Sequence, residues 1–317
     1  MSSVYELCLF MTMLGNYEPG IVDMIFKFMK SYTFKTNKEL YEGVNLWCGN
    51  REEAIQKYGH ISYWDVSHIT DMSQLFKNKT KFNDDISCWN VSHVTKMYYM
   101  FADAKSFNQP IGDWDVSSVT NMNWIFSHAK KFNQPIGDWD VTHVTEMEGV
   151  FYHSEEFNQP IEYWDVAYVT DMAYMFQHAY KFNQPLSNWN VRNVTNMEYM
   201  FYSAKEFNQR IGNWNVSSVR TMEYMFHHTY KFNRPIGNWD VSSVTHMNNM
   251  FSVAWKFNQP IGDWDVSNVI TMVDMFSNAY KFNQHIRDWN VSSVVNMSGM
   301  FKNATNFELK YKPKIMK

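Results

Sequence analysis

Tryptophan recurs at a fixed interval of 25 residues through most of the 317-residue chain. Ten tryptophans keep this spacing without an insertion: Trp64, Trp89, Trp114, Trp139, Trp164, Trp189, Trp214, Trp239, Trp264 and Trp289. Columns of Val, Met and Phe that never vary accompany them, such as Val66 to Val291 and Phe76 to Phe301. A strict period of this length predicts a solenoid, in which each repeat stacks on the previous one in the same register.

Each unit begins with apolar steps that match the leucine-rich-repeat signature. In the third unit these residues are Ile111, Trp114, Val116 and Val119. We expect a short strand centred on Trp-Asp-Val, because alternate residues there would point inward. The next apolar residues have helical spacing: Met122, Ile125, Phe126 and Ala129. Thr120 is placed to cap that helix, and Thr145 with Glu148 has the spacing of a capping box, as does Thr195 with Glu198. The prediction is an α/β, leucine-rich-repeat-like solenoid of ten 25-residue strand–helix repeats with a helical N-terminal cap.

A typical unit reads FNQPIGDWDVSSVTNM. It resembles the BspA-like leucine-rich repeat proteins, whose 25-residue units contain FNQxIxxWDVSxVTxMxxMF. Bacterial members of that family look like surface proteins or lipoproteins, and similar arrays occur in protists and large DNA viruses. The resemblance implies an interaction scaffold, with adhesion proposed for the bacterial members.

The periodicity also divides the chain into segments. We expect an N-terminal helical segment at 1–35, a helical cap at 36–59, the ten-repeat solenoid at 60–307 and a C-terminal tail at 308–317. Leu40, Val44 and Trp47 would share one face of the first cap helix, and Asn50 is placed to cap the second. A cap is needed because the first repeat would otherwise expose its core edge.

The segment 18–29, EPGIVDMIFKFM, resembles the core of an F-box. The F-box is a short helical module that docks Skp-type adaptors of ubiquitin ligases. The resemblance implies that Ile21, Ile25 and Phe26 contact such an adaptor. The alternative is an extra helical hairpin that covers the end of the repeats.

A row of carboxylates is the first candidate binding surface, and we expect it on the concave face. It comprises Asp113, Asp115, Asp138, Asp140 and Asp165. Carboxylates stacked at about 5 Å repel one another unless a cation or a basic partner compensates. The alternative is that neighbouring backbone and Ser or Thr donors satisfy them.

A row of aromatic residues is the second candidate surface, expected on the convex crest opposite the buried stripe. It comprises Tyr99, Trp124, Tyr174, Tyr199 and Tyr224. Exposed aromatic residues in a row suggest a binding strip. The alternative is that each ring lies flat on the next repeat.

Two further columns have expected roles. The Asn83 to Asn283 column should bond backbone groups in the return loop. The histidines of the other column are His128, His153, His178 and His228. We expect no metal site there, because convex spacing is too wide for their nitrogens to meet at one zinc ion.

Catalytic motifs are absent: the sequence has no Gly-rich phosphate loop, no G-x-S-x-G and no H-E-x-x-H. We therefore expect no enzyme, no cofactor and no small-molecule substrate. A net charge of -4 disfavours nucleic acid as a partner. No apolar stretch approaches the length of a membrane span. Three cysteines, and no signal peptide or lipobox, favour a cytoplasmic or host-intracellular location, with the cell surface as the alternative.

Taken together, these features predict a non-catalytic repeat scaffold that mediates protein–protein interaction. One alternative is an intracellular F-box-like adaptor that recruits a ubiquitin ligase through residues 1–35. The other is a cell-surface adhesin.

Overall fold

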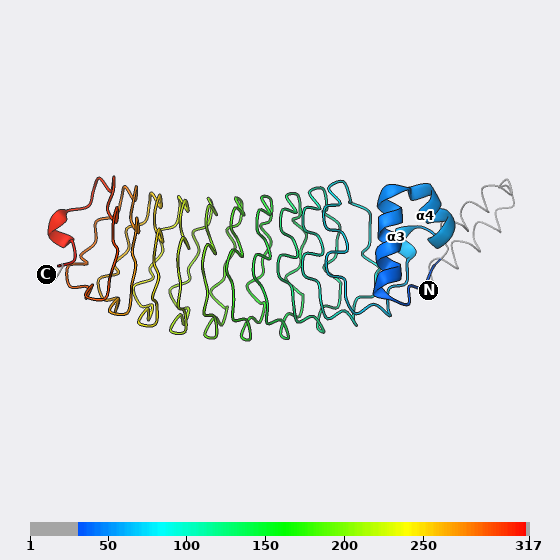
Figure 1. Ribbon diagram of the computed structural model, residues 1–317, viewed down its shortest axis with the longest axis horizontal. Coiled ribbons are helices and arrows are strands. Elements are labelled where there is room, and N and C mark those ends of the chain that lie inside the picture. The colour runs from blue at the N-terminus through cyan, green and yellow to red at the C-terminus, as the bar shows by residue number, and fades with distance from the viewer. Residues whose placement is uncertain (1–30, 315–317) are drawn as a thin grey trace.

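The computed structural model describes residues 31–314, which form an elongated array of repeats (Figure 1). Two helices, α3 (Asn37–Gly49) and α4 (Arg51–Tyr58), lie at the N-terminal end of the array. Two short 3-10 helices, η1 (Ile61–Tyr63) and η2 (Leu309–Tyr311), flank the repeats. Between η1 and η2 the described chain contains no helix and no strand, only turns and isolated bridges.

The two helices begin where side chains cap them. Thr36 accepts a hydrogen bond from the backbone N–H of Glu39, and Asn50 accepts one from that of Glu53. Such caps satisfy backbone donors that have no partner inside a helix. The buried side chains of α3 are those of Leu40, Val44 and Trp47, as their spacing predicted.

Residues 71–78 hold successive repeats together. Four backbone N–H groups of the first repeat donate to carbonyls of the second at 2.8 to 3.0 Å: Met72 to Lys96, Gln74 to Tyr98, Phe76 to Met100 and Asn78 to Ala102. The residues between these donors close tight turns within the repeat, as when Leu75 donates to Met72. Nine parallel bridges continue the pattern from Asp71–Lys96 to Thr271–Asn296. We call this set of bonds the hydrogen-bond ladder. The ladder face is the surface formed by the outward-pointing side chains of residues 71–78 and of the equivalent residues in the other repeats.

The strand–helix assignment of the sequence is therefore wrong, because the described repeats contain neither element. The segment predicted as a helix carries the ladder, and its N–H groups bond to the next repeat. A helix about 10 Å wide could not stack at the roughly 4.8 Å spacing of such bonds. The segment predicted as a strand forms two turns instead, closed by Trp114 donating to Ile111 and Val119 to Val116. No sheet and no concave sheet face exist in the described residues, and we call the surface over these turns the turn face.

The expected capping boxes are wrong for the same reason. The backbone N–H of Glu148 donates to the side chain of Asn123 in the preceding repeat at 2.7 Å. The hydroxyl of Thr145 donates to the carbonyl of Thr120, also one repeat earlier. Both residues thus bond between repeats rather than within one helix.

Stacked rings fill the core. Trp139 and Trp164 are parallel with centroids 6.4 Å apart, and Phe126 and Phe151 are parallel at 5.9 Å. The indole N–H of Trp164 donates to the carbonyl of Ile136 at 3.0 Å. The rings of Phe and Trp thus fill the core. The indole N–H of Trp also donates to a backbone carbonyl, whereas Leu has no hydrogen-bond donor in its side chain. This explains why the chain has 13 Trp and 24 Phe but only eight Leu.

The asparagine column bonds neighbouring return loops. The side-chain oxygen of Asn108 accepts the backbone N–H of Asn133 at 2.9 Å, and that of Asn133 accepts the N–H of Asn158 at the same distance. The structural role predicted for this column is confirmed.

Candidate functional site

One outward-pointing column of the ladder face differs strongly between repeats. From the first repeat to the tenth, the column of Tyr99 reads Gln, Tyr, Trp, Gly, Tyr, Tyr, Tyr, Asn, Asp, Gly. On the turn face, the column of Asp115 contains only Asp and Asn. Stacking makes the same demand of every repeat, so it does not explain differences among outward-pointing side chains. Turn-face columns also differ, as at Cys88, Asp113 and Tyr163, so what distinguishes the ladder face is the row of large rings in the column of Tyr99.

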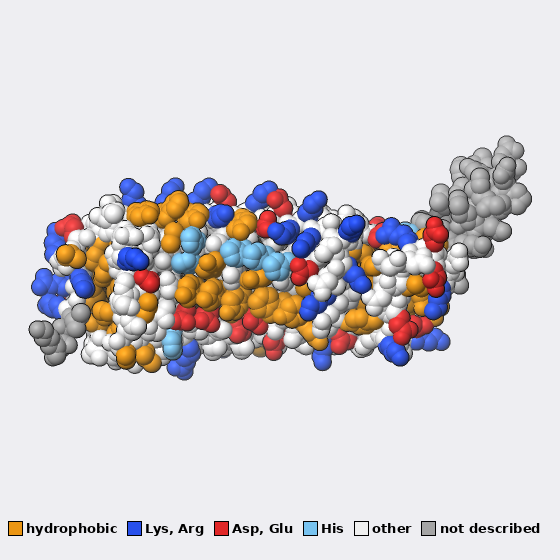
Figure 2. All heavy atoms as spheres, turned by 45° about the horizontal axis from the view of Figure 1, so that its top comes forward, with side chains coloured by type: hydrophobic (Ala, Val, Ile, Leu, Met, Phe, Trp, Pro, Cys, Tyr) orange, Lys and Arg blue, Asp and Glu red, His pale blue; other side chains and the backbone are white. Residues whose placement is uncertain are grey.

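Five aromatic side chains form a continuous stack on this face, which we call the aromatic stripe. Its centroid distances are 6.0 Å for Tyr99–Trp124, 5.6 Å for Trp124–Tyr174, 5.0 Å for Tyr174–Tyr199 and 4.5 Å for Tyr199–Tyr224. Figure 2 shows a band of hydrophobic side chains along the middle of the array. Each ring packs on its neighbour in the stack and remains partly exposed. The helix crest expected to carry these residues does not exist, but the structure brings all five together.

The backbone of the stripe is strained. Each of its five residues has a φ between 55° and 61°, in the left-handed region. That region costs a residue with a Cβ roughly 1–2 kcal/mol and is tolerated best by Gly, Asn and Asp. The eighth, ninth and tenth repeats place Asn249, Asp274 and Gly299 at this position. Large rings thus stand where small residues would fold with less strain.

A row of imidazoles runs beside the stripe. We call His128, His153, His178 and His228 the imidazole row. The rings of His128 and His153 stack at 4.5 Å, and those of His153 and His178 at 4.1 Å. This is closer than the wide convex spacing that the sequence led us to expect. Within residues 31–314 no group of three or more His, Cys, Asp or Glu side chains could hold a metal ion.

Burial controls the charge of these histidines. It lowers the pKa of His153 to about 3 and that of His178 to about 4, with smaller effects from neighbouring cationic groups. His227 was not singled out from the sequence, yet burial lowers its pKa to about 3 as well. It stacks on Tyr202 at 4.9 Å. These three imidazoles are neutral at pH 7, so this side of the stripe carries no charge from them.

Carboxylates line the other side of the stripe. We call Glu146, Glu148, Asp171, Glu198 and Glu223 the acidic edge. Side-chain amides donate to three of them: Asn123 to Glu146 at 2.8 Å, Asn196 to Asp171 at 3.1 Å, and Asn248 to Glu223. Asp171 also accepts the backbone N–H of Ala173 at 2.8 Å, and the side chain of Trp124 donates to Glu148. Sequence analysis missed this group, although the column of Glu148 differs among repeats as the stripe does.

Two members of the acidic edge have perturbed pKa values. Burial, a hydrogen bond to Glu223 and the charge of that residue raise the pKa of Glu198 to about 7. Burial also raises the pKa of Glu148, and the charges of Asp171 and Glu146 add to the effect. The carboxylates are therefore close enough to repel one another.

The predicted aspartate row lies on the turn face, where three of its members are bonded locally. Asp115 accepts the backbone N–H of Ser117 at 3.1 Å and its hydroxyl at 2.6 Å. Asp140 accepts the N–H of Thr142 at 3.1 Å, and Asp165 that of Ala167 at 3.0 Å. Asp113 and Asp138 are exposed, each within the turn that precedes the tryptophan of its repeat. The bonds of the first three residues stabilise the turns of their own repeats.

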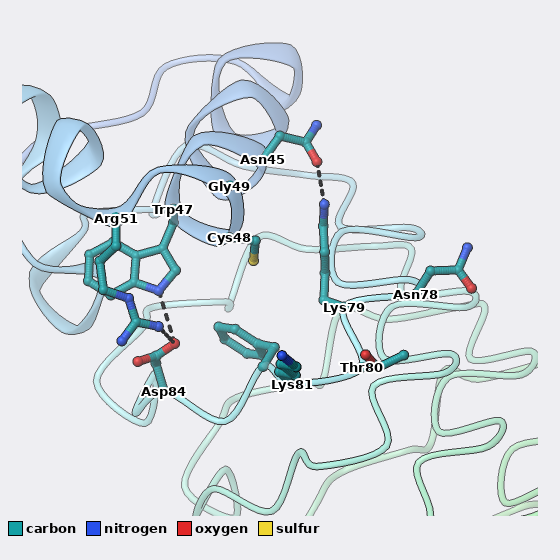
Figure 3. Close-up of a pocket in the computed structure, with 11 residues that line it drawn as sticks. Asn45, Trp47, Cys48, Gly49, Arg51, Asn78, Lys79, Thr80, Lys81 and Asp84 are labelled. Carbon is teal, nitrogen blue, oxygen red and sulfur yellow. Dashed lines mark hydrogen bonds and ion pairs between the residues drawn. The ribbon is translucent and has the colours of Figure 1, made fainter.

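A hollow of about 520 Å³ separates the cap from the first repeat (Figure 3). Asp84 accepts hydrogen bonds from the indole of Trp47 at 2.9 Å and from Arg51 at 2.7 Å. Lys79, the one large residue in its column, donates to Asn45 at 2.7 Å. These side chains bond to one another across the hollow, so they hold the cap on the array.

The family of the chain follows from its repeats. The model of the family described as Mycoplasma protein of unknown function, DUF285, matches residues 48–153, 134–236 and 209–313. The chain belongs to the DUF285 family. The DUF285 matches cover the end of α3, all of α4 and nearly all of the repeats, including the aromatic stripe. No curated protein matches the chain.

Among solved structures, the chain is similar to one from the crystal structure of the TLR13–ssRNA13 complex. The two are 9% identical, with a TM-score of 0.26, over 87% of this DUF285 chain and 52% of the other chain. The chain thus spans about half the length of that neighbour.

Two other features bear on the sequence-based hypotheses. Ile21, Ile25 and Phe26 lie outside the described residues, so adaptor docking through them stays a prediction. Among the described residues, the helices are too short and too polar to cross a membrane.

Proposed function

We propose that this DUF285 protein is a non-catalytic repeat scaffold that binds a protein partner through the aromatic stripe. The observation that carries the proposal is the stack of five large, partly exposed rings at a position where the other repeats have Gln, Gly, Asn or Asp. The backbone is left-handed at this position in every repeat, and large side chains are the costly choice there.

The chemistry of the stripe supports this role. Tyr and Trp are enriched among the residues that dominate binding energy at protein interfaces. They present a rigid, amphipathic surface with few rotatable bonds, so little conformational entropy is lost when a partner binds. The resemblance of the repeats to BspA-like proteins also favours a scaffold over an enzyme.

The double substitution Tyr199→Asn with Tyr224→Asn tests the proposal. Asn tolerates the left-handed backbone, so the stability of each variant should stay within about 1 kcal/mol of wild type. Wild type and variant serve as baits in lysate of the source cells, and captured proteins are quantified by mass spectrometry. We expect the variant to lose the specific partners.

The matched control is Tyr163→Asn with Tyr168→Asn on the turn face. These two rings are 79% and 61% exposed, so their loss removes aromatic surface away from the stripe. The control should retain every partner. Equal capture by wild type and by the Tyr199 and Tyr224 variant would contradict the proposal.

A further inference from the structure

Carboxylates on the two sides of the ladder face differ in their ion pairing. Beyond the imidazole row, Glu155 pairs with Lys130 at 2.7 Å, Glu156 pairs with Lys181, and Glu206 pairs with Lys231. On the acidic edge, within the described part of the chain, none of the five carboxylates forms an ion pair. The array therefore supplies lysines for one set of glutamates and none for the other.

This imbalance costs the free protein energy. Glu198 and Glu223 lie side by side and partly buried, and like charges in such a setting repel strongly. The pair shares a hydrogen bond when Glu198 is protonated, and the neutral amide of Asn248 donates to Glu223, but within residues 31–314 no cationic side chain pairs with either carboxylate. A cation placed against the pair would relieve the repulsion.

We propose that the partner segment on the aromatic stripe is an extended basic peptide whose arginine side chains lie on the acidic edge. This inference rests on the proposed function, because the peptide is placed on the stripe. Its apolar parts would pack on the exposed ring edges, and its guanidinium groups would meet the carboxylates beside them. Figure 2 shows red side chains directly along one border of the hydrophobic band.

The dimensions suit such a segment. The stripe runs from the second repeat to the seventh, five steps of about 4.8 Å, or about 24 Å in all. An extended peptide of about seven residues has that length. The acidic edge runs beside it from the fourth repeat to the seventh.

Arginine fits better than lysine for two reasons. Its planar guanidinium can donate to two carboxylate oxygens at once, which suits the adjacent Glu198 and Glu223. It also stacks on aromatic surfaces, and the stripe lies next to these carboxylates. The neutral imidazoles on the opposite side place no positive charge of their own against a basic peptide. The ammonium of Lys77 lies 4.6 Å from the centre of the Tyr99 ring, at the end of the stripe away from the acidic edge.

Fluorescence anisotropy with labelled hepta-arginine tests this inference. The full chain is compared with Glu198→Gln, Glu223→Gln and with a control that also replaces two carboxyl groups by amides, Asp113→Asn, Asp138→Asn. We expect wild type and control to bind with the same Kd. The Glu198 and Glu223 variant should bind roughly tenfold more weakly, because it lacks the paired carboxylates but keeps their shape.

Two results would overturn the inference. One is the absence of hepta-arginine binding to wild type. The other is equal binding by the two double variants, which would show attraction by net charge alone. Labelled hepta-lysine tests whether the guanidinium group is preferred to an ammonium group. If hepta-lysine binds to wild type as tightly as hepta-arginine does, the assignment of arginine is overturned.

Failure of this inference is distinguishable from failure of the proposed function. If Tyr199→Asn, Tyr224→Asn loses its cellular partners while hepta-arginine fails the tests above, the scaffold proposal stands and the basic peptide is wrong. If that variant keeps its cellular partners and its affinity for hepta-arginine, both proposals are wrong. The thermal transition of Glu198→Gln, Glu223→Gln should match or exceed that of wild type, so weaker binding cannot be due to unfolding.

Discussion

The indole of Trp124 lies across the Cα of Gly149, so a Cβ built at position 149 would stand 2.2 Å from the ring. Gly149 has a φ of 59° and occupies the position of the aromatic stripe in the fourth repeat. Because it has no side chain, Trp124 can lean over it and reach Tyr174, with a centroid distance of 5.6 Å. One glycine thereby keeps the stripe continuous across a repeat that contributes no ring.

Gly149→Ala should break this arrangement. The added methyl group would meet the indole and would also occupy a left-handed backbone position. We expect a loss of about 1–3 kcal/mol in the free energy of unfolding, measured by urea denaturation. Gly49→Ala is the control, because a Cβ there meets nothing within 4 Å. Equal stability of the Gly149 variant and wild type would contradict the packing described.

Trp164→Ala should divide the array. The substitution removes a ring that is 2% exposed, its stacking on Trp139 and its bond to Ile136. We expect a cost of about 3–5 kcal/mol. Because each repeat contacts only its neighbours, thermal unfolding should split into two steps. The control is Tyr163→Ala, at the exposed neighbouring position, which should leave the thermal transition unchanged. A single, unaltered transition in the Trp164 variant would contradict ring stacking as the source of stability.

The buried histidines predict a loss of stability at acid pH. His153, His178 and His227 have pKa values of about 3, 4 and 3 in the folded protein, against an ordinary value of 6.5. Between pH 6.5 and about 4 the unfolded chain binds protons that the folded chain does not, so stability falls as pH decreases. His153→Gln with His178→Gln should flatten the fall of Tm over this window. The exposed His93→Gln should not, and the same effect from both would refute this explanation.

Glu198 predicts the opposite slope at higher pH. Its pKa is about 7 when folded, against 4.5 ordinarily, so the folded chain retains a proton that the unfolded chain has released. Stability from this group is present below pH 4.5 and is lost as pH rises to about 7. We expect Glu198→Gln to raise Tm more at pH 8 than at pH 5. The control is Glu156→Gln, which removes an ion pair with Lys181 and should not raise Tm. If Glu198→Gln changes Tm equally at the two pH values, the raised pKa of Glu198 is wrong.

The sequence predicted correctly which residues of a repeat are buried in the core. The columns of Trp114, Val116 and Phe126 are buried as expected, and so is the face of α3 that contains Trp47. Asn50 caps α4 because that interaction is local, reaching three residues along the chain. The asparagine column was also recognised, because its invariance suited a role in every return loop.

The hydrogen-bond ladder could not be derived in the same way. Met122, Ile125 and Phe126 have helical spacing, but a succession of tight turns with left-handed residues buries the same side chains. Which backbone results depends on partners 25 residues away, such as the Glu146 carbonyl that accepts from Met122. The acidic edge was missed for the same reason, since Glu198 and Glu223 become neighbours only when their repeats stack.

By itself, the 25-residue period of tryptophan determined that the chain is a repeat array, where each repeat begins and which columns form its core. These properties depend on hydrophobicity and register, which are written along the chain. Only the tertiary structure decided that the repeats are joined by a ladder of turns, and that rings, imidazoles and carboxylates lie side by side on one face. The physical reason is that these contacts form between repeats, where backbone hydrogen bonds set the spacing and the left-handed residues set the direction of the side chains.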